Sequence, residues 1–190
     1  MKTALITGAT SGIGEATARI LAKHNYKVIL CGRREDRLLD LEKELLQFTE
    51  VHTLQFDVRD KNAVLKSIQS LPAHFSTIDV LINNAGNAHG LDPIQNGDLD
   101  DWDAMIDINV KGLLYVSKAV IPRMIELKSG HIINIGSIAG KEVYPNGNVY
   151  CASKHAVDAL NQAMRIDLNP YGIRVGGIHP GAASHASSTS

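Results

Sequence analysis

Short aliphatic runs alternate with helical patterns along almost the whole chain, and this alternation limits the fold more than any other feature. We predict strands at residues 2–7, 27–31, 51–57, 79–83, 131–135 and 174–178. We predict helices at residues 13–25, 36–47, 60–71, 101–128 and 149–168, the fourth with a bend at Pro122. Several of the strands are continuous aliphatic runs, which is typical of a parallel sheet covered by helices on both faces. The pattern therefore predicts an α/β fold with a doubly wound parallel sheet, whose ligand crevice lies at the carboxyl ends of the strands.

Length and charge narrow the organisation of the chain. With 190 residues, 44% of them hydrophobic, one domain with its own core fits better than two. We assign this domain to residues 1–181 and expect residues 182–190 to be a polar, low-complexity tail. The formal net charge of -1 leaves no overall positive field, so nucleic acid and anionic membranes are not expected partners.

The cysteines and histidines indicate a reduced compartment and no metal site. Cys31 and Cys151 stand far apart in apolar surroundings, so we expect two buried free thiols in a cytoplasmic protein. The apolar run after Met1 is too short for a signal peptide or a membrane span. The eight histidines show no His-x-x-x-His spacing, and the chain has no Cys-x-x-Cys, so no metal ligands are predicted.

A glycine-rich turn follows the first predicted strand and reads Thr-Gly-Ala-Thr-Ser-Gly-Ile-Gly over residues 7–14. Glycines let the backbone approach a ligand closely, and the free N–H groups at the start of the next helix can face a pyrophosphate. We therefore expect cofactor contacts from this turn, namely from Gly8, Thr10, Ser11, Gly12, Ile13 and Gly14. Such a turn can also serve tight packing alone, but its place after the first strand favours a phosphate cradle.

The end of the second predicted strand distinguishes between two dinucleotides. An acidic residue at this point would hold the ribose 2'-hydroxyl of NAD, whereas an arginine accepts the 2'-phosphate of NADP. The chain has Gly32-Arg33-Arg34 here, so we predict NADP, with ordinary solvated charge as the alternative. We expect Glu35 and Asp36, which follow, to cap the next helix and interact with its dipole.

Two further strand ends carry residues suited to the adenine and to a tight turn beside the cofactor. Asp57 and Val58 end the third strand, and Asn84, Ala85 and Gly86 follow the fourth. Taken singly, either group of residues can belong to an ordinary turn that binds no ligand. Because the carboxyl ends of parallel strands meet at one edge of a sheet, we expect these residues to contact the same cofactor.

Ser137, Tyr150 and Lys154 form the pattern with the clearest chemistry. Tyr150 and Lys154 are four residues apart and therefore share one face of a helix. A phenol is a weak acid at neutral pH, but a neighbouring ammonium favours the phenolate and makes Tyr150 a usable acid or base. Ser137 can hydrogen-bond the substrate oxygen, and Asn109 can order a water relay to Lys154. The alternative is an exposed helical pair, which the upstream serine and the glycine cradle make less plausible.

Together these motifs resemble the classical short-chain dehydrogenase/reductase family from Lys2 to about Gly181. The matching motifs are Thr7-Gly8-x-x-x-Gly12-Ile13-Gly14, Asn83-Asn84-Ala85-Gly86, Asn109, Ser137, Tyr150-x-x-x-Lys154 and Pro180-Gly181. The resemblance implies a Rossmann fold with strand order 3-2-1-4-5-6. It also implies cofactor contacts from Tyr150, Lys154, Pro180 and Gly181. By the same resemblance, Tyr150 is the catalytic acid/base, Ser137 the anchor of the substrate oxygen, Lys154 the ribose ligand and perturbing charge, and Asn109 the relay residue.

Within the family, the runs at residues 32–34, 71–73 and 130–137 are similar to an NADP-dependent 3-hydroxy acid or serine dehydrogenase branch. That similarity implies hydride transfer between NADP(H) and the alcohol or carbonyl carbon of a small 3-hydroxy acid or serine-like substrate. Two alternatives stay open: reduction of another carbonyl, such as a 3-ketoacyl compound, and a non-catalytic NADP-binding module. Serine hydrolysis through Ser137 is not predicted, because the serine does not stand in a Gly-x-Ser-x-Gly sequence.

After Gly181 the chain departs from the family pattern. Ala183 and His185 stand where the family has Val and Thr, and the usual substrate lid and last strand do not follow. We therefore expect a truncated chain, with the cofactor crevice formed and the substrate pocket open on one side. The amphipathic helices through Asn109 and Tyr150 resemble the faces by which this family forms homodimers or homotetramers.

Overall fold

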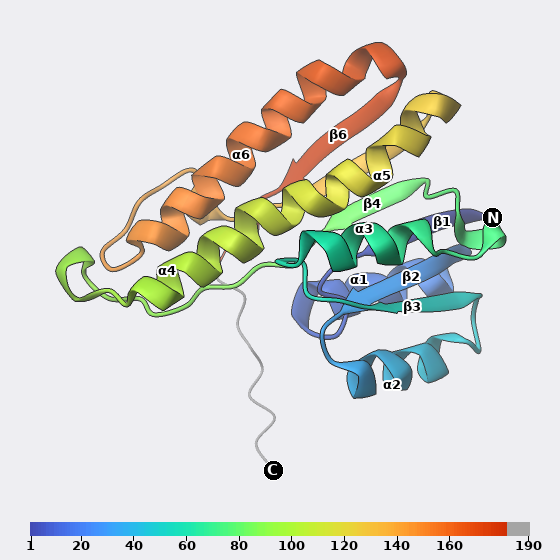
Figure 1. The fold of residues 1–190 in the computed structure, drawn as a ribbon, viewed down its shortest axis with the longest axis horizontal. Coiled ribbons are helices and arrows are strands. Elements are labelled where there is room, and N and C mark those ends of the chain that lie inside the picture. The colour runs from blue at the N-terminus through green and yellow to red at the C-terminus, as the bar shows by residue number, and fades with distance from the viewer. Residues whose placement is uncertain (182–190) are drawn as a thin grey trace.

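A six-stranded parallel sheet forms the centre of the molecule (Figure 1). The structure is a computed structural model and describes residues 1–181. The strands are β1 (Lys2–Ile6), β2 (Tyr26–Gly32), β3 (Val51–Gln55), β4 (Val80–Asn83), β5 (Gly130–Ile135) and β6 (Ile173–Ile178). Their order is β3-β2-β1-β4-β5-β6, which confirms the predicted doubly wound α/β fold and its strand order. Within residues 1–181, β6 is the last strand at its edge of the sheet.

Helices cover both faces of this sheet. They are α1 (Gly12–Lys23), α2 (Glu35–Leu45), α3 (Lys61–Gln69), α4 (Leu99–Ile106), α5 (Leu113–Leu127) and α6 (Asn148–Leu168). Figure 1 shows α3, α5 and α6 in front of the sheet, while α1 packs on the opposite face. Asp60 and Asp98 begin α3 and α4 as side-chain caps, since each carboxylate accepts two backbone N–H groups.

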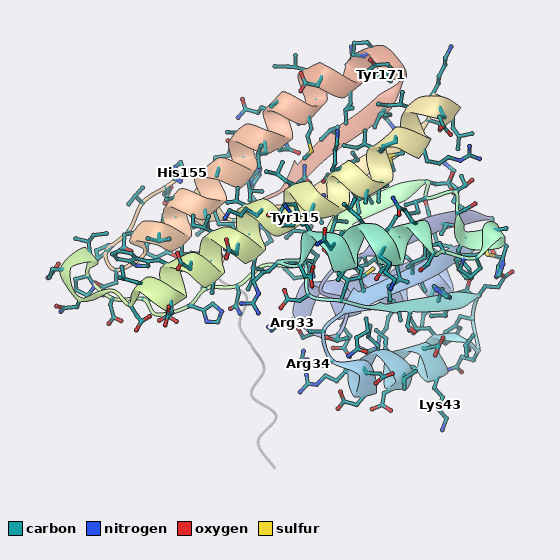
Figure 2. All side chains as sticks on the ribbon, viewed as in Figure 1. Arg33, Arg34, Lys43, Tyr115, His155 and Tyr171 are labelled. Carbon is teal, nitrogen blue, oxygen red and sulfur yellow. The ribbon has the colours of Figure 1, made fainter. Side chains whose placement is uncertain are left out.

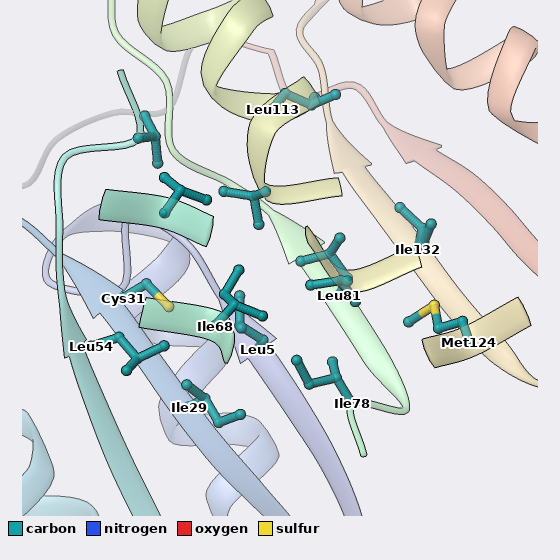
Figure 3. Close-up of a cluster of buried hydrophobic side chains, with 14 of the residues drawn as sticks. Leu5, Ile29, Cys31, Leu54, Ile68, Ile78, Leu81, Leu113, Met124 and Ile132 are labelled. Atoms are coloured by element: carbon teal, nitrogen blue, oxygen red, sulfur yellow. The ribbon is translucent and has the colours of Figure 1, made fainter. Parts of the chain in front are cut away.

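The core consists of two apolar layers, one on each face of the sheet. Successive strand residues point to opposite faces, so neighbours in sequence join different layers. The first layer, drawn in Figure 3, takes Leu5, Ile29, Leu81 and Ile132 from the strands. The second takes Ala4, Ile6, Leu30 and Ile82 and packs against α1 and α2. The continuous aliphatic strands are therefore explained by burial on both faces, as predicted.

The long helical region before β5 differs from the prediction. α5 continues through Pro122 without a break, and the bend at this residue stays a prediction. The irregularity lies earlier, where a π-helical segment (Asp107–Gly112) separates α4 from α5. Segments of this kind often occur at functional sites, because the wider turn changes the direction of the side chains. Here the segment contains Asn109.

The structure also bears on the predictions about the cysteines, the start of α2 and the end of the chain. Cys31 and Cys151 are buried free thiols, as predicted. The prediction that Glu35 and Asp36 cap α2 is wrong, because Arg34 occupies the N-cap position without a side-chain cap. Both acids lie in the first turn instead, where their negative charges interact favourably with the helix dipole. None of the helices described is long and apolar enough to cross a bilayer. The predicted low-complexity tail, 182–190, including Ala183 and His185, lies outside the described residues.

Candidate active site

Two adjoining cavities lie at the carboxyl ends of the strands and contain most of the predicted site residues. The larger has a volume of about 890 Å³, and the smaller about 350 Å³. Both are lined by Gly8, Ser11, Ala85, Gly86 and Asn87, so these residues form the boundary between them. The larger is also lined by Gly12, Ile13, Asn84, Ser137, Tyr150, Lys154, Pro180 and Gly181. The smaller is also lined by Thr10, Arg33, Arg34, Asp57 and Val58.

The glycine-rich turn between β1 and α1 is shaped by the absence of side chains. Gly8 has φ +60°, which is the left-handed region that favours glycine. A Cβ atom on Gly14 would lie 2.2 Å from the Gly8 carbonyl oxygen and 2.3 Å from Asn84 Nδ2. The turn therefore packs directly on the start of α1, where Ser11, Gly12 and Ile13 line the larger cavity. This backbone cradle fits the diphosphate of a dinucleotide.

The segment after β4 holds this turn in place. Thr7 Oγ1 accepts hydrogen bonds from the backbone N–H groups of Asn84 (3.0 Å) and Ala85 (2.9 Å). In return, Asn84 Nδ2 donates to the carbonyl oxygens of Thr7 and Gly8, both at 3.1 Å. Thr7 belongs to the glycine motif, but no role was predicted for its side chain. Its position immediately before Gly8 is the feature of the sequence that could have indicated one.

The smaller cavity has the character of a site for the adenosine end of a dinucleotide. Arg34 Nη2 donates to Thr10 Oγ1 at 3.1 Å, which brings a guanidinium next to the glycine turn. Arg33 and Arg34 are labelled in Figure 2 beside α2. Asp57 is paired with Arg59 at 2.7 Å, a partner that the sequence reasoning missed. Burial opposes ionisation of Asp57, but the hydrogen bonds and charge of Arg59 outweigh it and hold the pKa of the Asp57 carboxyl below its usual value.

At the other end, β5 and α6 bring Ser137, Tyr150 and Lys154 to the larger cavity. Ser137 follows β5, and its Oγ accepts from the backbone N–H of Ala139 at 3.1 Å. Lys154 Nζ lies 6.0 Å from the centre of the Tyr150 ring, one helical turn away. Lys154 is only 7% exposed, and its Nζ donates to the Ile135 carbonyl oxygen at 3.4 Å. Burial lowers the pKa of the Lys154 ammonium from its ordinary 10.5 to about 8.

Backbone hydrogen bonds place Pro180 next to Ser137. The Gly136 N–H donates to the Ile178 carbonyl oxygen at 2.7 Å, and the Ile138 N–H donates to that of Pro180 at 3.1 Å. The pairing of β5 with β6 thus continues past the ends of both strands. This pairing fixes the backbone before and after Ser137, and this stretch forms one wall of the larger cavity.

Asn109 lies behind the cavity rather than on its surface. It is 1% exposed, and its amide spans two elements by donating to the Asn87 carbonyl oxygen (2.8 Å) and to Ser153 Oγ (3.0 Å). Its Oδ1 accepts from the backbone N–H of Asn87 at 2.7 Å. A Cβ atom on Gly86 would lie 3.3 Å from this oxygen and 3.2 Å from Lys154 Nζ, so both groups meet at Gly86. The contacts described therefore brace the segment after β4 against α6.

Asn83 and several cavity residues were not anticipated in their observed places. Asn83 belongs to the predicted turn motif, but its side chain is buried and donates to Ser117 Oγ (3.0 Å) and Asn134 Oδ1 (2.9 Å). It thus joins β4 to α5 and β5 rather than facing the cavity. The sequence reasoning also missed as lining residues Ala16, Asn87, Ala88, Ile135 and Ile138. Most of these are small or apolar, so no chemical signal in the sequence marked them.

Comparison with known proteins identifies the family. The family model described as short chain dehydrogenase matches residues 2–189. The NADP-dependent 3-hydroxy acid dehydrogenase YdfG of Salmonella typhi is 48% identical over 177 residues, covering 93% of this chain and 71% of that protein. Sulfoacetaldehyde reductase 2 of Chromohalobacter salexigens is 48% identical over 180 residues, with 94% and 71% covered.

A solved structure agrees with these relatives. The closed form of a serine dehydrogenase complexed with NADP+ superimposes with a TM-score of 0.91 at 45% identity, covering 94% of this chain and 71% of that one. The resemblance read from the motifs is thereby confirmed: the chain belongs to the short chain dehydrogenase family.

Proposed function

We propose that the chain is an NADP-dependent oxidoreductase that transfers a hydride between NADP(H) and the alcohol or carbonyl carbon of a small 3-hydroxy acid or serine-like substrate. The observation that carries this proposal is the shared cavity: Ser137, Tyr150 and Lys154 line the same space as the glycine cradle. The names of the relatives, which include a 3-hydroxy acid dehydrogenase and a serine dehydrogenase, support the substrate class.

The cofactor would lie across both cavities. The proposed diphosphate contacts are Gly8, Thr10, Ser11, Gly12, Ile13 and Gly14, with Asn84, Ala85 and Gly86 beside them. Arg33 and Arg34 would hold the 2'-phosphate, and Asp57 and Val58 would contact the adenine. Pro180 and Gly181 border the nicotinamide end, where bound NADP+ supplies the acceptor for the hydride. The cavity volumes, the cradle and the paired arginines support this placement.

The proton chemistry belongs to Tyr150. The Lys154 ammonium lies 6.0 Å from the centre of its ring, and both side chains line the larger cavity. Ser137 donates a hydrogen bond to the substrate oxygen and fixes its position. As the hydride leaves the substrate carbon, the phenolate of Tyr150 accepts the hydroxyl proton, and the alcohol becomes a carbonyl. Lys154 also binds the ribose, and Asn109 orders a water relay to Lys154 from behind Gly86.

The direct test is the variant Tyr150→Phe, which keeps the ring and removes the hydroxyl. Turnover of 3-hydroxy acids should be almost abolished, whereas the dissociation constant for NADPH, measured by fluorescence titration, should stay close to that of the wild type. Tyr171→Phe is the matched control, because this tyrosine lies beyond the other end of α6 (Figure 2). Unchanged turnover of Tyr150→Phe would reject Tyr150 as the acid/base.

The same measurements address the two alternatives. A non-catalytic module would bind NADPH and turn over none of the compounds tested, and a reductase of another carbonyl would prefer a ketoacyl compound. Neither is favoured by the 3-hydroxy acid and serine dehydrogenases among the relatives.

We also propose a cytoplasmic location and a homodimer or homotetramer. The two buried free thiols support a reducing compartment. Exposed apolar side chains along the long helices support self-association, namely Leu99, Leu114 and Leu127 on α4 and α5, and Ile166 on α6. Light scattering at several protein concentrations measures the oligomeric state.

A further inference from the structure

The charges around the larger cavity raise the question of how an acid would be bound there. Among the described residues that line it, Lys154 is the only charged side chain, and none carries a carboxylate. A substrate acid therefore meets no like charge from these residues. The Lys154 ammonium, however, lies deep beside Gly86 and the Ile135 carbonyl oxygen. Neutral donors at the cavity surface must then contribute to binding a carboxylate.

Tyr144 is such a donor. It lies in the segment between Ser137 and Tyr150 and lines the same cavity as both. The residue is 38% exposed, so part of it contacts the protein and part of it is open. Ser137 and Tyr150 are needed at the reacting alcohol, which leaves Tyr144 for another part of the substrate.

The packing of Tyr144 holds its ring in one place. A Cβ atom on Gly147 would lie 2.4 Å from Tyr144 Cε2 and 2.9 Å from Cys151 Sγ, so the ring rests on the bare backbone of Gly147 beside the thiol. The turn below is closed by a hydrogen bond from the Gly147 N–H to the Tyr144 carbonyl oxygen at 3.2 Å. The Cys151 N–H in turn donates to the Gly147 carbonyl oxygen at 2.6 Å, which attaches the turn to α6. A ring held in this way loses little conformational entropy when a ligand binds.

The protonation of Tyr144 suits a donor. Burial raises the pKa of the Tyr144 phenol, and the electrostatic effect of nearby Cys151 and Tyr150 and a side-chain hydrogen bond with Cys151 raise it further. Tyr144 therefore keeps its proton at neutral pH and can donate it in a hydrogen bond.

We propose that the hydroxyl of Tyr144 donates a hydrogen bond to the carboxylate of the hydroxy acid and selects acids over neutral alcohols. The assignment rests on the proposed function, because it places the alcohol oxygen at Ser137 and Tyr150. In a 3-hydroxy acid a single methylene separates the reacting carbon from the carboxyl carbon. The segment 137–150 carries the residues for both ends of such a molecule, so one short stretch of chain sets the substrate length.

The test compares Tyr144→Phe with the wild type on 3-hydroxypropionate and on 1,3-propanediol, which has a neutral hydroxymethyl group in place of the carboxylate. Hydrogen bonds to charged groups are about twice as strong as those between neutral groups. We expect KM for the acid to rise about tenfold or more, with kcat within about twofold, and KM for the diol to rise less than about threefold. The NADPH dissociation constant should not change. Tyr171→Phe again serves as the control.

Two results would overturn this assignment. Equal effects on acid and diol would mean that Tyr144 shapes the cavity without recognising charge, and an unchanged KM for the acid would mean that the hydroxyl makes no contact. If the wild type turns over neither compound, the proposed function fails, and calorimetric titration of 3-hydroxypropionate into the NADP+-saturated chain decides the role of Tyr144. Absent binding, or equal dissociation constants for wild type and Tyr144→Phe, would then overturn it. Thermal melting of both proteins verifies that the variant is folded.

Discussion

Replacing Lys154 by methionine should make the protein more stable and inactive at the same time. Methionine has a similar length and no charge to bury, so it fits a position that is 7% exposed. The hydrogen bond that would be lost, from Nζ to the Ile135 carbonyl oxygen, is long at 3.4 Å. The variant lacks the ammonium that we propose to bind the ribose and to act beside Tyr150, so turnover should fall to background. Such an exchange of stability for activity is common at functional sites.

The magnitude follows from the pKa of Lys154. In the unfolded chain the hydrated ammonium keeps its ordinary pKa of 10.5, whereas burial lowers it to about 8 in the folded protein. Each tenfold change in proton affinity corresponds to about 1.4 kcal/mol, so keeping the charge in the fold costs about 3 kcal/mol at pH 7. This cost is fully present below about pH 8 and decreases as the pH rises towards 10.5. Above that value the amine is neutral in both states and the cost disappears.

Urea denaturation at two pH values measures the effect. Lys154→Met should raise the free energy of unfolding by about 3 kcal/mol at pH 7 and by about 1.5 kcal/mol at pH 9.5. Lys118→Met, at an exposed position of α5, should change it by less than about 0.5 kcal/mol at either pH. The reasoning is refuted if Lys154→Met is no more stable than the wild type at pH 7, or if its advantage does not shrink at pH 9.5.

Two further predictions concern the cofactor. Gly14→Ala places a Cβ atom 2.2 Å from the Gly8 carbonyl oxygen, so the closely packed cradle must shift. Fluorescence titration should show NADPH binding weakened by about a hundredfold or more. Binding within threefold of the wild type would contradict a closely packed cradle. Replacing Arg33 and Arg34 together by alanine should weaken NADPH binding by about tenfold or more and leave NADH binding nearly unchanged. The reason is that only NADPH carries the 2'-phosphate. Equal losses of affinity for both cofactors would assign the arginines another role.

The features that the sequence predicts well depend on local patterns repeated along the chain. Aliphatic runs such as 27–31 identified the strands, because burial on both faces requires apolar side chains at every position. The residues of the glycine turn and the Tyr150–Lys154 pair were found because their spacing has a direct geometric meaning. Parallel strands then bring their carboxyl ends to one edge, so the shared cavities followed from the fold.

The features that the sequence did not predict depend on contacts between distant segments. The π-helical turn at Asp107–Gly112 has only Gly112 as a local helix-weakening residue, and it occurs where Asn109 is bonded to Asn87 and Ser153. Pro122 is a strong local signal, yet the helix around it stays intact because it packs on the core. Asn83 has the composition of a turn residue, and only the observed packing reveals that it serves the core.

The hydrogen bonds between Thr7 and the segment at Asn84 have a consequence for how the protein is made. These partners are 77 residues apart in sequence, so the nucleotide cradle is not locally encoded. During synthesis the chain can complete β1 and α1 early, but the turn between them lacks its bonds to Asn84 and Ala85 until β4 has emerged from the ribosome and paired with β1. Ligand-assisted folding of the nascent chain can therefore begin only after translation has passed Asn84.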